Sequence, residues 1–131
     1  MFRLVTSVLL LGLTTVVGAE TTLPQYGKDL HLGVVTCAGS TCHGATKPSA
    51  DVTILQNEAL TWQREDKHAK AYKILLNEDS RRIARNLGLK DAHTAQVCLD
   101  CHTDNAPTEK RGKRFQISDG VGCEACHGGS E

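Results

Sequence analysis

The sequence predicts a mainly α-helical fold with much irregular loop, and two observations lead to this prediction. Stretches with apolar residues at helical spacing lie between residues 57 and 101, and segments rich in Gly, Pro and Ser flank them. The six cysteines form three pairs, and a histidine follows each pair directly. A chain of 131 residues has the length of one domain, which we expect to be organised around these pairs.

The repeated motif has the form Cys-x-x-Cys-His in two of its three copies. Its residues are Cys98, Cys101 and His102, then Cys123, Cys126 and His127, and, with four intervening residues, Cys37, Cys42 and His43. The pattern is typical of haem c attachment, because two sulfurs one helical turn apart can add to two vinyl groups and the histidine then lies under the iron. The small residues of the wider copy allow its loop to bulge. The motifs predict three covalently bound haem c groups in a small multihaem cytochrome c fold.

Two other interpretations of the cysteines are a zinc ribbon and a disulfide framework. Two Cys-x-x-Cys pairs are also a zinc signature, and the gap at residues 103–122 fits it tolerably. An oxidising compartment would allow disulfides. Both interpretations leave the pair Cys37 and Cys42 and the three following histidines unexplained, so we favour haem.

The first 19 residues have the features of a secretory signal peptide. A positive start at residues 1–3 precedes an apolar run at 4–17, and Val17-Gly18-Ala19 forms a small-residue cleavage site. We expect cleavage after Ala19, which gives a domain of residues 20–131 in the periplasm or otherwise exported. The alternative is an uncleaved anchor, although the run is short of the about 20 residues that a span needs.

Composition limits the partners and the core. The formal net charge is zero, so there is no electrostatic case for nucleic acid, and no later segment is apolar enough to span a membrane. We expect redox proteins as donor and acceptor, with association with a membrane or a multihaem complex as a further option. The mature aromatics are only Tyr26, Trp62, Tyr72 and Phe115, so we expect haem to supply the missing apolar bulk and the chain without haem to be unfolded.

The first half of the chain contains one expected helix. Residues 21–32 are expected to be an irregular leader, and residues 44–51 a turn-rich connector. The helical pattern then runs from about residue 57 to 77, and one face of it carries His68, Ala71, Tyr72 and Leu75.

A second helix is expected to begin with Ser80 as its cap and to end at Gly88. Its apolar stripe consists of Ile83, Ala84 and Leu87. Its other side carries Arg81, Arg82 and Arg85, which form either a solvated face or a set of partners for haem propionates.

A third helix is expected over residues 92–101, with Asp91 as its cap, and it delivers the second haem motif. Residues 106–116 include the basic run 110–114 and are expected to be a mobile, solvated loop. A docking surface for an acidic redox partner, or a clamp on propionates, is the alternative. Residues 118–122 form a Gly-rich approach to the third motif.

The six histidines divide into two sets of three. The expected proximal ligands are His43, His102 and His127, and the candidate distal ligands are His31, His68 and His93. The alternatives are a partly exposed loop histidine for His31, a core histidine for His68 and a surface histidine for His93. The only methionine is Met1, which leaves with the signal peptide, so each haem is bis-histidine, five-coordinate or ligated from another chain. Bis-histidine ligation predicts low potentials.

The order of these motifs and histidines along the chain resembles that of multihaem c-type cytochromes of the cytochrome c554 type, a family of tetrahaem electron carriers. The resemblance covers about residues 30–129, in the segments 31–34, 37–44, 65–69, 97–102 and 120–129. It implies proximal roles for His43, His102 and His127, a distal role for His68, and stacked haem pairs that pass single electrons. The family usually has a fourth haem after the stretch matching Gly128-Gly129, so we expect this chain to be the N-terminal trihaem part of something longer. The first motif is also wider than in the family.

The function expected from the sequence is electron transfer between redox partners through closely packed haems, without catalytic residues. One alternative is a haem enzyme, or a subunit of one, that reduces or oxidises a small nitrogen or sulfur compound at a five-coordinate haem. A further alternative is a structural wire, in which copies stack haem to haem in a filament.

Overall fold

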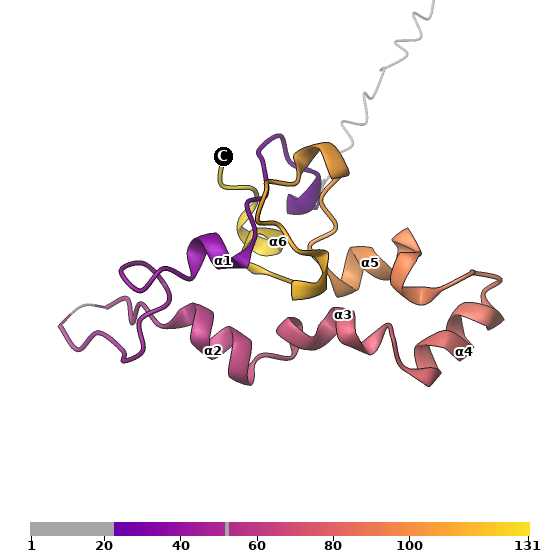
Figure 1. Cartoon of the computed structure of the whole chain (residues 1–131), viewed down its shortest axis with the longest axis horizontal. Coiled ribbons are helices and arrows are strands. Elements are labelled where there is room, and N and C mark those ends of the chain that lie inside the picture. The colour runs from indigo at the N-terminus through magenta and orange to yellow at the C-terminus, as the bar shows by residue number, and fades with distance from the viewer. Residues whose placement is uncertain (1–22, 52) are drawn as a thin grey trace, which may run out of the picture.

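The computed structural model describes residues 23–51 and 53–131 (Figure 1). Within these ranges the regular elements are short helices, and no β-strand is present. The prediction of a mainly helical fold with much loop is therefore confirmed. The expected signal peptide, residues 1–19, lies outside the described residues.

The helices follow one another along an elongated molecule. The α-helices are α1 (Val34–Cys37), α2 (Glu58–Glu65), α3 (Ala71–Ile74), α4 (Glu78–Asn86), α5 (Gln96–His102) and α6 (Cys123–His127). The 3-10 helices are η1 (Pro24–Tyr26), η2 (Lys67–Lys70), η3 (Ala92–Thr94), η4 (Thr108–Lys110) and η5 (Ile117–Asp119). Figure 1 shows α2, α3 and α4 in a row along the long axis, with α1, α6 and α5 in a second row beside them. No helix in the described part is long and apolar enough to cross a membrane.

The single helix expected over residues 57–77 is wrong, because the chain breaks it at Asp66. Asp66 is extended (φ −80°, ψ 133°), so α2 ends before it and η2 begins after it. Its side chain caps the new turn by accepting a hydrogen bond from the His68 N–H at 2.9 Å. The same carboxylate also contacts the His68 ring, so the break orients a candidate ligand.

The second helix, α4, begins earlier than expected. Asn77 is its cap and accepts a hydrogen bond from the Ser80 N–H at 2.8 Å, while the Ser80 hydroxyl donates to the Ile74 carbonyl. Ala84 is buried as expected, but Ile83 and Leu87 are exposed, so the apolar stripe is wrong for these two residues.

The C-terminal end of α4 agrees with the prediction, whereas the next helix differs from it in two ways. Gly88 adopts a positive φ of 69° where α4 ends, as expected. The helix expected over 92–101 is instead η3, an extended Ala95 (ψ 122°), and α5. The side chain of Asp91 makes no capping hydrogen bond, so its expected role is also wrong.

Two of the three arginines of α4 form pairs within their own helix. Arg81 contacts Glu78 at 2.6 Å and Arg82 contacts Asp79 at 2.9 Å, both at i,i+3 spacing on the exposed side. These contacts favour the solvated-face interpretation of the arginines.

The hydrophobic core of the described residues is small. It consists of Leu75, Ala84, Ala92 and Leu99, with Tyr72, Leu89, Cys98 and Ile117 packed against it. Large apolar side chains that remain exposed include Val35, Ile54, Leu55, Ile74 and Val97. The chain therefore buries little large apolar surface by itself, which fits the expectation that a bound cofactor completes the core.

Distant segments meet around residue 31. The His31 N–H donates to the Lys110 carbonyl and the Gly112 N–H donates to the His31 carbonyl, both at 2.8 Å. Residues 103–106 are buried, and Ala106 has no exposed surface. The Arg111 guanidinium donates to the Ala106 carbonyl at 2.8 Å and lies over the Phe115 ring. The expected solvated loop over 106–116 is therefore wrong at Ala106, whereas Thr108 and Glu109 are exposed as expected.

Candidate functional site

Short helices carry the second and third cysteine motifs. Helix α5 ends in Cys98, Cys101 and His102, and α6 consists of Cys123–His127. In a helix, positions i, i+3 and i+4 share a face, so each pair of sulfurs and the following ring point to one side. In all three motifs the first cysteine is half-buried and the second is exposed, so every motif is anchored at one end and open at the other.

In the first motif, a loop and not a helix brings the second cysteine and the histidine back toward the first cysteine. Cys37 is the last residue of α1, and the His43 N–H donates back to the Cys37 carbonyl at 3.3 Å, so the intervening residues loop out. The Gly44 N–H donates to Gly39 at 2.9 Å and closes the loop a second time. Position 44 has room only for glycine, because a Cβ atom there would lie 2.0 Å from the Ala38 carbonyl oxygen.

An open cavity of about 570 Å³ brings two of the motifs together. The residues predicted as site residues that line it are Cys37, His43, His68, Cys123, Cys126 and His127. They come from α1 and the loop that follows it, from η2 and from α6, and α1 packs against α6. The cavity therefore joins the first and third motifs to one candidate distal ligand.

The remaining predicted residues lie elsewhere. The second motif on α5 does not line this cavity, and neither do His31 and His93. His93 is half-buried in η3. Of the three candidate distal ligands, the structure brings only His68 to the cavity.

The thiols of Cys37 and Cys123 confirm that the first and third motifs are neighbours. Burial, the largest cause, raises the pKa of both thiols above the usual cysteine value. Each thiol also affects the pKa of the other, which requires the two side chains to be close.

Besides His31, which is described below, three histidine rings have their Nδ1 atom engaged. His43 Nδ1 lies 3.0 Å from Glu58 Oε2, and His68 Nδ1 lies 2.9 Å from Asp66 Oδ1. His102 Nδ1 donates to the Ala71 carbonyl at 3.0 Å. A ring that donates its Nδ1–H in this way has an unprotonated Nε2 with a free lone pair. Metal-binding histidines are commonly held in this tautomer.

The carboxylate beside His43 is ionised at neutral pH. The pKa of Glu58 is lowered by a hydrogen bond from its own backbone N–H and by the His43 ring, followed by the backbone N–H of Gln56. Glu58 therefore accepts, and His43 donates, in the bond between them.

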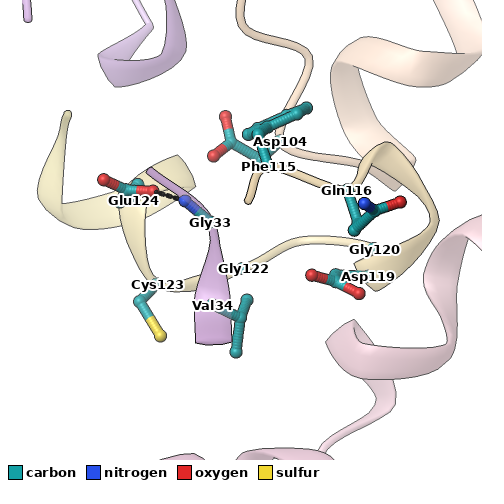
Figure 2. Close-up of a pocket in the computed structure, with 10 residues that line it drawn as sticks. All are labelled: Gly33, Val34, Asp104, Phe115, Gln116, Asp119, Gly120, Gly122, Cys123 and Glu124. Carbon is teal, nitrogen blue, oxygen red and sulfur yellow. Dashed lines mark hydrogen bonds between the residues drawn. The ribbon is translucent and has the colours of Figure 1, made fainter. Parts of the chain in front are cut away.

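A buried polar cluster includes Glu124 of α6, and Figure 2 shows Glu124 and Asp104 of this cluster with the hydrogen bond between Gly33 and Glu124. His31 is completely buried, with Nδ1 at 2.8 Å from Asp104 Oδ2, so the alternative of a partly exposed loop histidine is wrong. The Glu124 carboxylate accepts hydrogen bonds from the backbone N–H groups of Leu32 at 2.9 Å and Gly33 at 2.7 Å, and from the Ser130 hydroxyl. His31 Nε2 and Asp104 Oδ1 are buried without a partner.

Burial affects the two carboxylates of this cluster differently. Burial raises the pKa of Asp104 above its usual value. Burial also acts to raise the pKa of Glu124, but the hydrogen bonds from Ser130, Leu32 and Gly33 outweigh it and the pKa is lowered. Glu124 is therefore a buried carboxylate whose charge is stabilised by hydrogen bonds from the protein.

The alternative interpretations of the cysteines find no support. All six cysteines are free thiols. Among the described residues, the one cluster of three or more possible metal ligands is His31, Asp104 and Glu124, and it contains no cysteine. A zinc ribbon needs cysteine sulfurs around a common centre.

The residues that orient the histidines were not predicted from the sequence. Glu58 follows His43 by 15 residues, and no local pattern connects the two. Asp66 precedes His68 by two residues, and an Asp before a turn is a recognisable cap signal. Glu124 lies inside the third motif, between its two cysteines, and no role was predicted for it.

Residues 36–128 match the family model described as cytochrome c554 and c-prime, a range that contains all three cysteine motifs. Searches of curated proteins and of solved structures gave no significant match.

Proposed function

Because the chain belongs to the cytochrome c554 and c-prime family over residues 36–128, we propose that it is a periplasmic cytochrome with three haem c groups that passes electrons between redox proteins. Family membership implies a haem c electron carrier. The number of haems, the export of the chain and its protein partners are our proposals.

The observation that carries the proposal is the cavity shared by the first and third motifs. Its volume of about 570 Å³ lies in the range of cofactor sites, and half-buried thiols and exposed histidines line it. His43 and His68 point their engaged Nδ1 atoms to carboxylates, which leaves Nε2 of each for an iron. The residues present therefore fit haem c.

The residues proposed to hold the haems follow from the motifs. The covalent sites are Cys37 and Cys42, Cys98 and Cys101, and Cys123 and Cys126, with His43, His102 and His127 as proximal ligands. We propose His68 as a distal ligand, which its place in the cavity supports. His31 and His93 remain candidate distal ligands for haems outside this cavity.

Haem c, when bound, supplies an iron that cycles between its ferric and ferrous states and carries one electron. The chain contributes spacing, because the close approach of Cys37 and Cys123 supports a short distance between two carriers. It also contributes oriented ligands and an apolar surround. Family membership favours an electron carrier over a haem enzyme.

Intact mass and absorption spectra test the proposal in a host that attaches haem c. Three added haems with low-spin bands are expected for the wild type, and two for the double variant Cys37→Ala/Cys42→Ala. A high-spin component that binds cyanide would favour the enzyme. A wild-type protein without haem would overturn the proposal.

A further inference from the structure

Two proximal histidines have chemically different partners at Nδ1. His43 donates to the Glu58 carboxylate at 3.0 Å, whereas His102 donates to the Ala71 backbone carbonyl at 3.0 Å. The distances are the same, so the two sites differ in the charge of the acceptor. Nothing in the cysteine motifs themselves predicts this difference.

Hydrogen bonds from the turn before α2 fix the Glu58 carboxylate beside the first motif. Its second oxygen accepts the Gln56 N–H at 3.1 Å. Gln56 has a φ of 61°, a conformation that residues other than glycine rarely adopt and that surrounding contacts must stabilise. Its carbonyl accepts the Ala45 N–H at 2.7 Å, and the Ala59 N–H donates to the His43 carbonyl at 2.9 Å. The turn before α2 and the first turn of α2 are therefore bonded to the motif loop at His43 and at Ala45 just after it.

We propose that Glu58 is a positioning residue that lowers the reduction potential of the haem on Cys37 and Cys42 below that of the haem on Cys98 and Cys101. This inference rests on the proposed function. An anionic acceptor draws the Nδ1 proton more strongly than a neutral carbonyl does, which makes the imidazole a stronger electron donor to the iron. A stronger donor stabilises the ferric state and so lowers the potential.

The difference gives electron flow a direction within the chain. The haem at the first motif is reduced after the haem at the second motif in an equilibrium titration. An electron delivered at the first motif then moves downhill toward the second. The chain therefore distinguishes an entry end from an exit end by one carboxylate.

Glu58→Gln in the haem-loaded protein tests the proposal. The glutamine oxygen can still accept from His43 but is neutral, so the variant reproduces the chemistry of Ala71 beside His102. In a spectroelectrochemical titration, we expect one midpoint potential to shift upward, toward that of the second motif, and the others to stay. The low-spin ferric EPR signal of the same haem shifts as well. The component that shifts is the one missing from Cys37→Ala/Cys42→Ala.

Glu65→Gln is the matched control, because Glu65 is an exposed residue of the same helix and the charge change is the same. An equal shift in both variants would mean a general charge effect and would overturn the proposal. Glu58→Asp keeps the charge and withdraws the carboxylate by one methylene, so it also raises the potential. If Glu58→Asp behaves as the wild type, the hydrogen bond is not the cause.

Haem counting separates this inference from the proposed function. Three haems with an unshifted potential in Glu58→Gln overturn the role of Glu58 alone. A wild-type protein without haem at Cys37 and Cys42 overturns the proposed function, and the inference with it, and intact mass identifies that case. If Glu58→Gln does not attach the haem at Cys37 and Cys42, the midpoint potential of that haem is measured in Glu58→Asp instead.

Discussion

The backbone carbonyl of His68 accepts a hydrogen bond from the N–H of Val121 at 3.1 Å. Val121 precedes Cys123 by two residues, so this bond ties the candidate distal ligand to the third motif. Trp62 of α2 donates its indole N–H to the Val121 carbonyl at 3.0 Å and holds the same residue from the other side. The cavity wall that carries His68 is thus fixed by two hydrogen bonds to one residue.

Gly120→Ala should disturb this contact. A Cβ atom at residue 120 would lie 2.4 Å from the His68 carbonyl oxygen, and the φ of 80° is strained for alanine. We expect a loss of about 1 to 3 kcal/mol in the free energy of unfolding and a high-spin component in the ferric spectrum. Gly88→Ala is the control, since its φ is 69° and no atom lies within 4 Å of the new Cβ. Equal effects of the two variants, in denaturation and in the spectrum, would contradict the prediction.

Gly44→Ala should impair haem attachment at the first motif alone. The new Cβ would lie 2.0 Å from the Ala38 carbonyl oxygen, so the loop that brings Cys42 and His43 back to Cys37 cannot close as observed. Intact mass should show a large fraction of protein with one haem fewer. Gly39→Ala lies in the same loop, with its nearest atom at 4.0 Å, and should retain the full mass. Full haem loading in Gly44→Ala would show that the loop adapts.

The predictable parts of this molecule are those specified by local spacing. The second motif was correctly placed on a helix, α5, because residues at i, i+3 and i+4 define a helical face; no helix was predicted for the third motif, which lies on α6. The break at Asp66 was missed because the apolar periodicity continues through it, while a side-chain cap decides the backbone there. The partnership of His43 with Glu58 was not predictable, because a turn with a positive φ at Gln56 brings them together. Site residues that act through tertiary contacts leave no periodic signal.

Glu124→Ala should destabilise the fold strongly. The carboxylate is the acceptor for the N–H groups of Leu32 and Gly33 and for the Ser130 hydroxyl, and its removal leaves these donors without a partner. Ser130 is exposed and its hydroxyl can bond water, whereas each of the two backbone N–H groups left unsatisfied costs about 1 to 3 kcal/mol, so we expect a total loss of about 2 kcal/mol or more. Thermal and chemical denaturation of the haem-loaded protein measure it.

Two further variants at acidic positions make the Glu124 result specific. Glu124→Gln retains an acceptor oxygen and should recover part of the lost stability. Glu65→Ala removes an exposed carboxylate and should change the free energy of unfolding by less than about 0.5 kcal/mol. A loss in Glu124→Ala no larger than in Glu65→Ala would show that the backbone donors find other partners.

Asp119→Asn should stabilise the protein at neutral pH and not in acid. Burial raises the pKa of Asp119, which lines the small cavity of Figure 2, so the folded state favours its protonated form. A raised folded pKa means that wild-type stability falls as pH rises from the unfolded value of about 3.9 through the folded value. Asparagine cannot ionise and avoids this loss. The variant should therefore be more stable than the wild type at pH 7 and equal to it below about pH 3.9 in urea denaturation. Asp51→Asn removes an exposed carboxylate and should show no such pH dependence, so parallel curves for the two variants would contradict the assignment to burial.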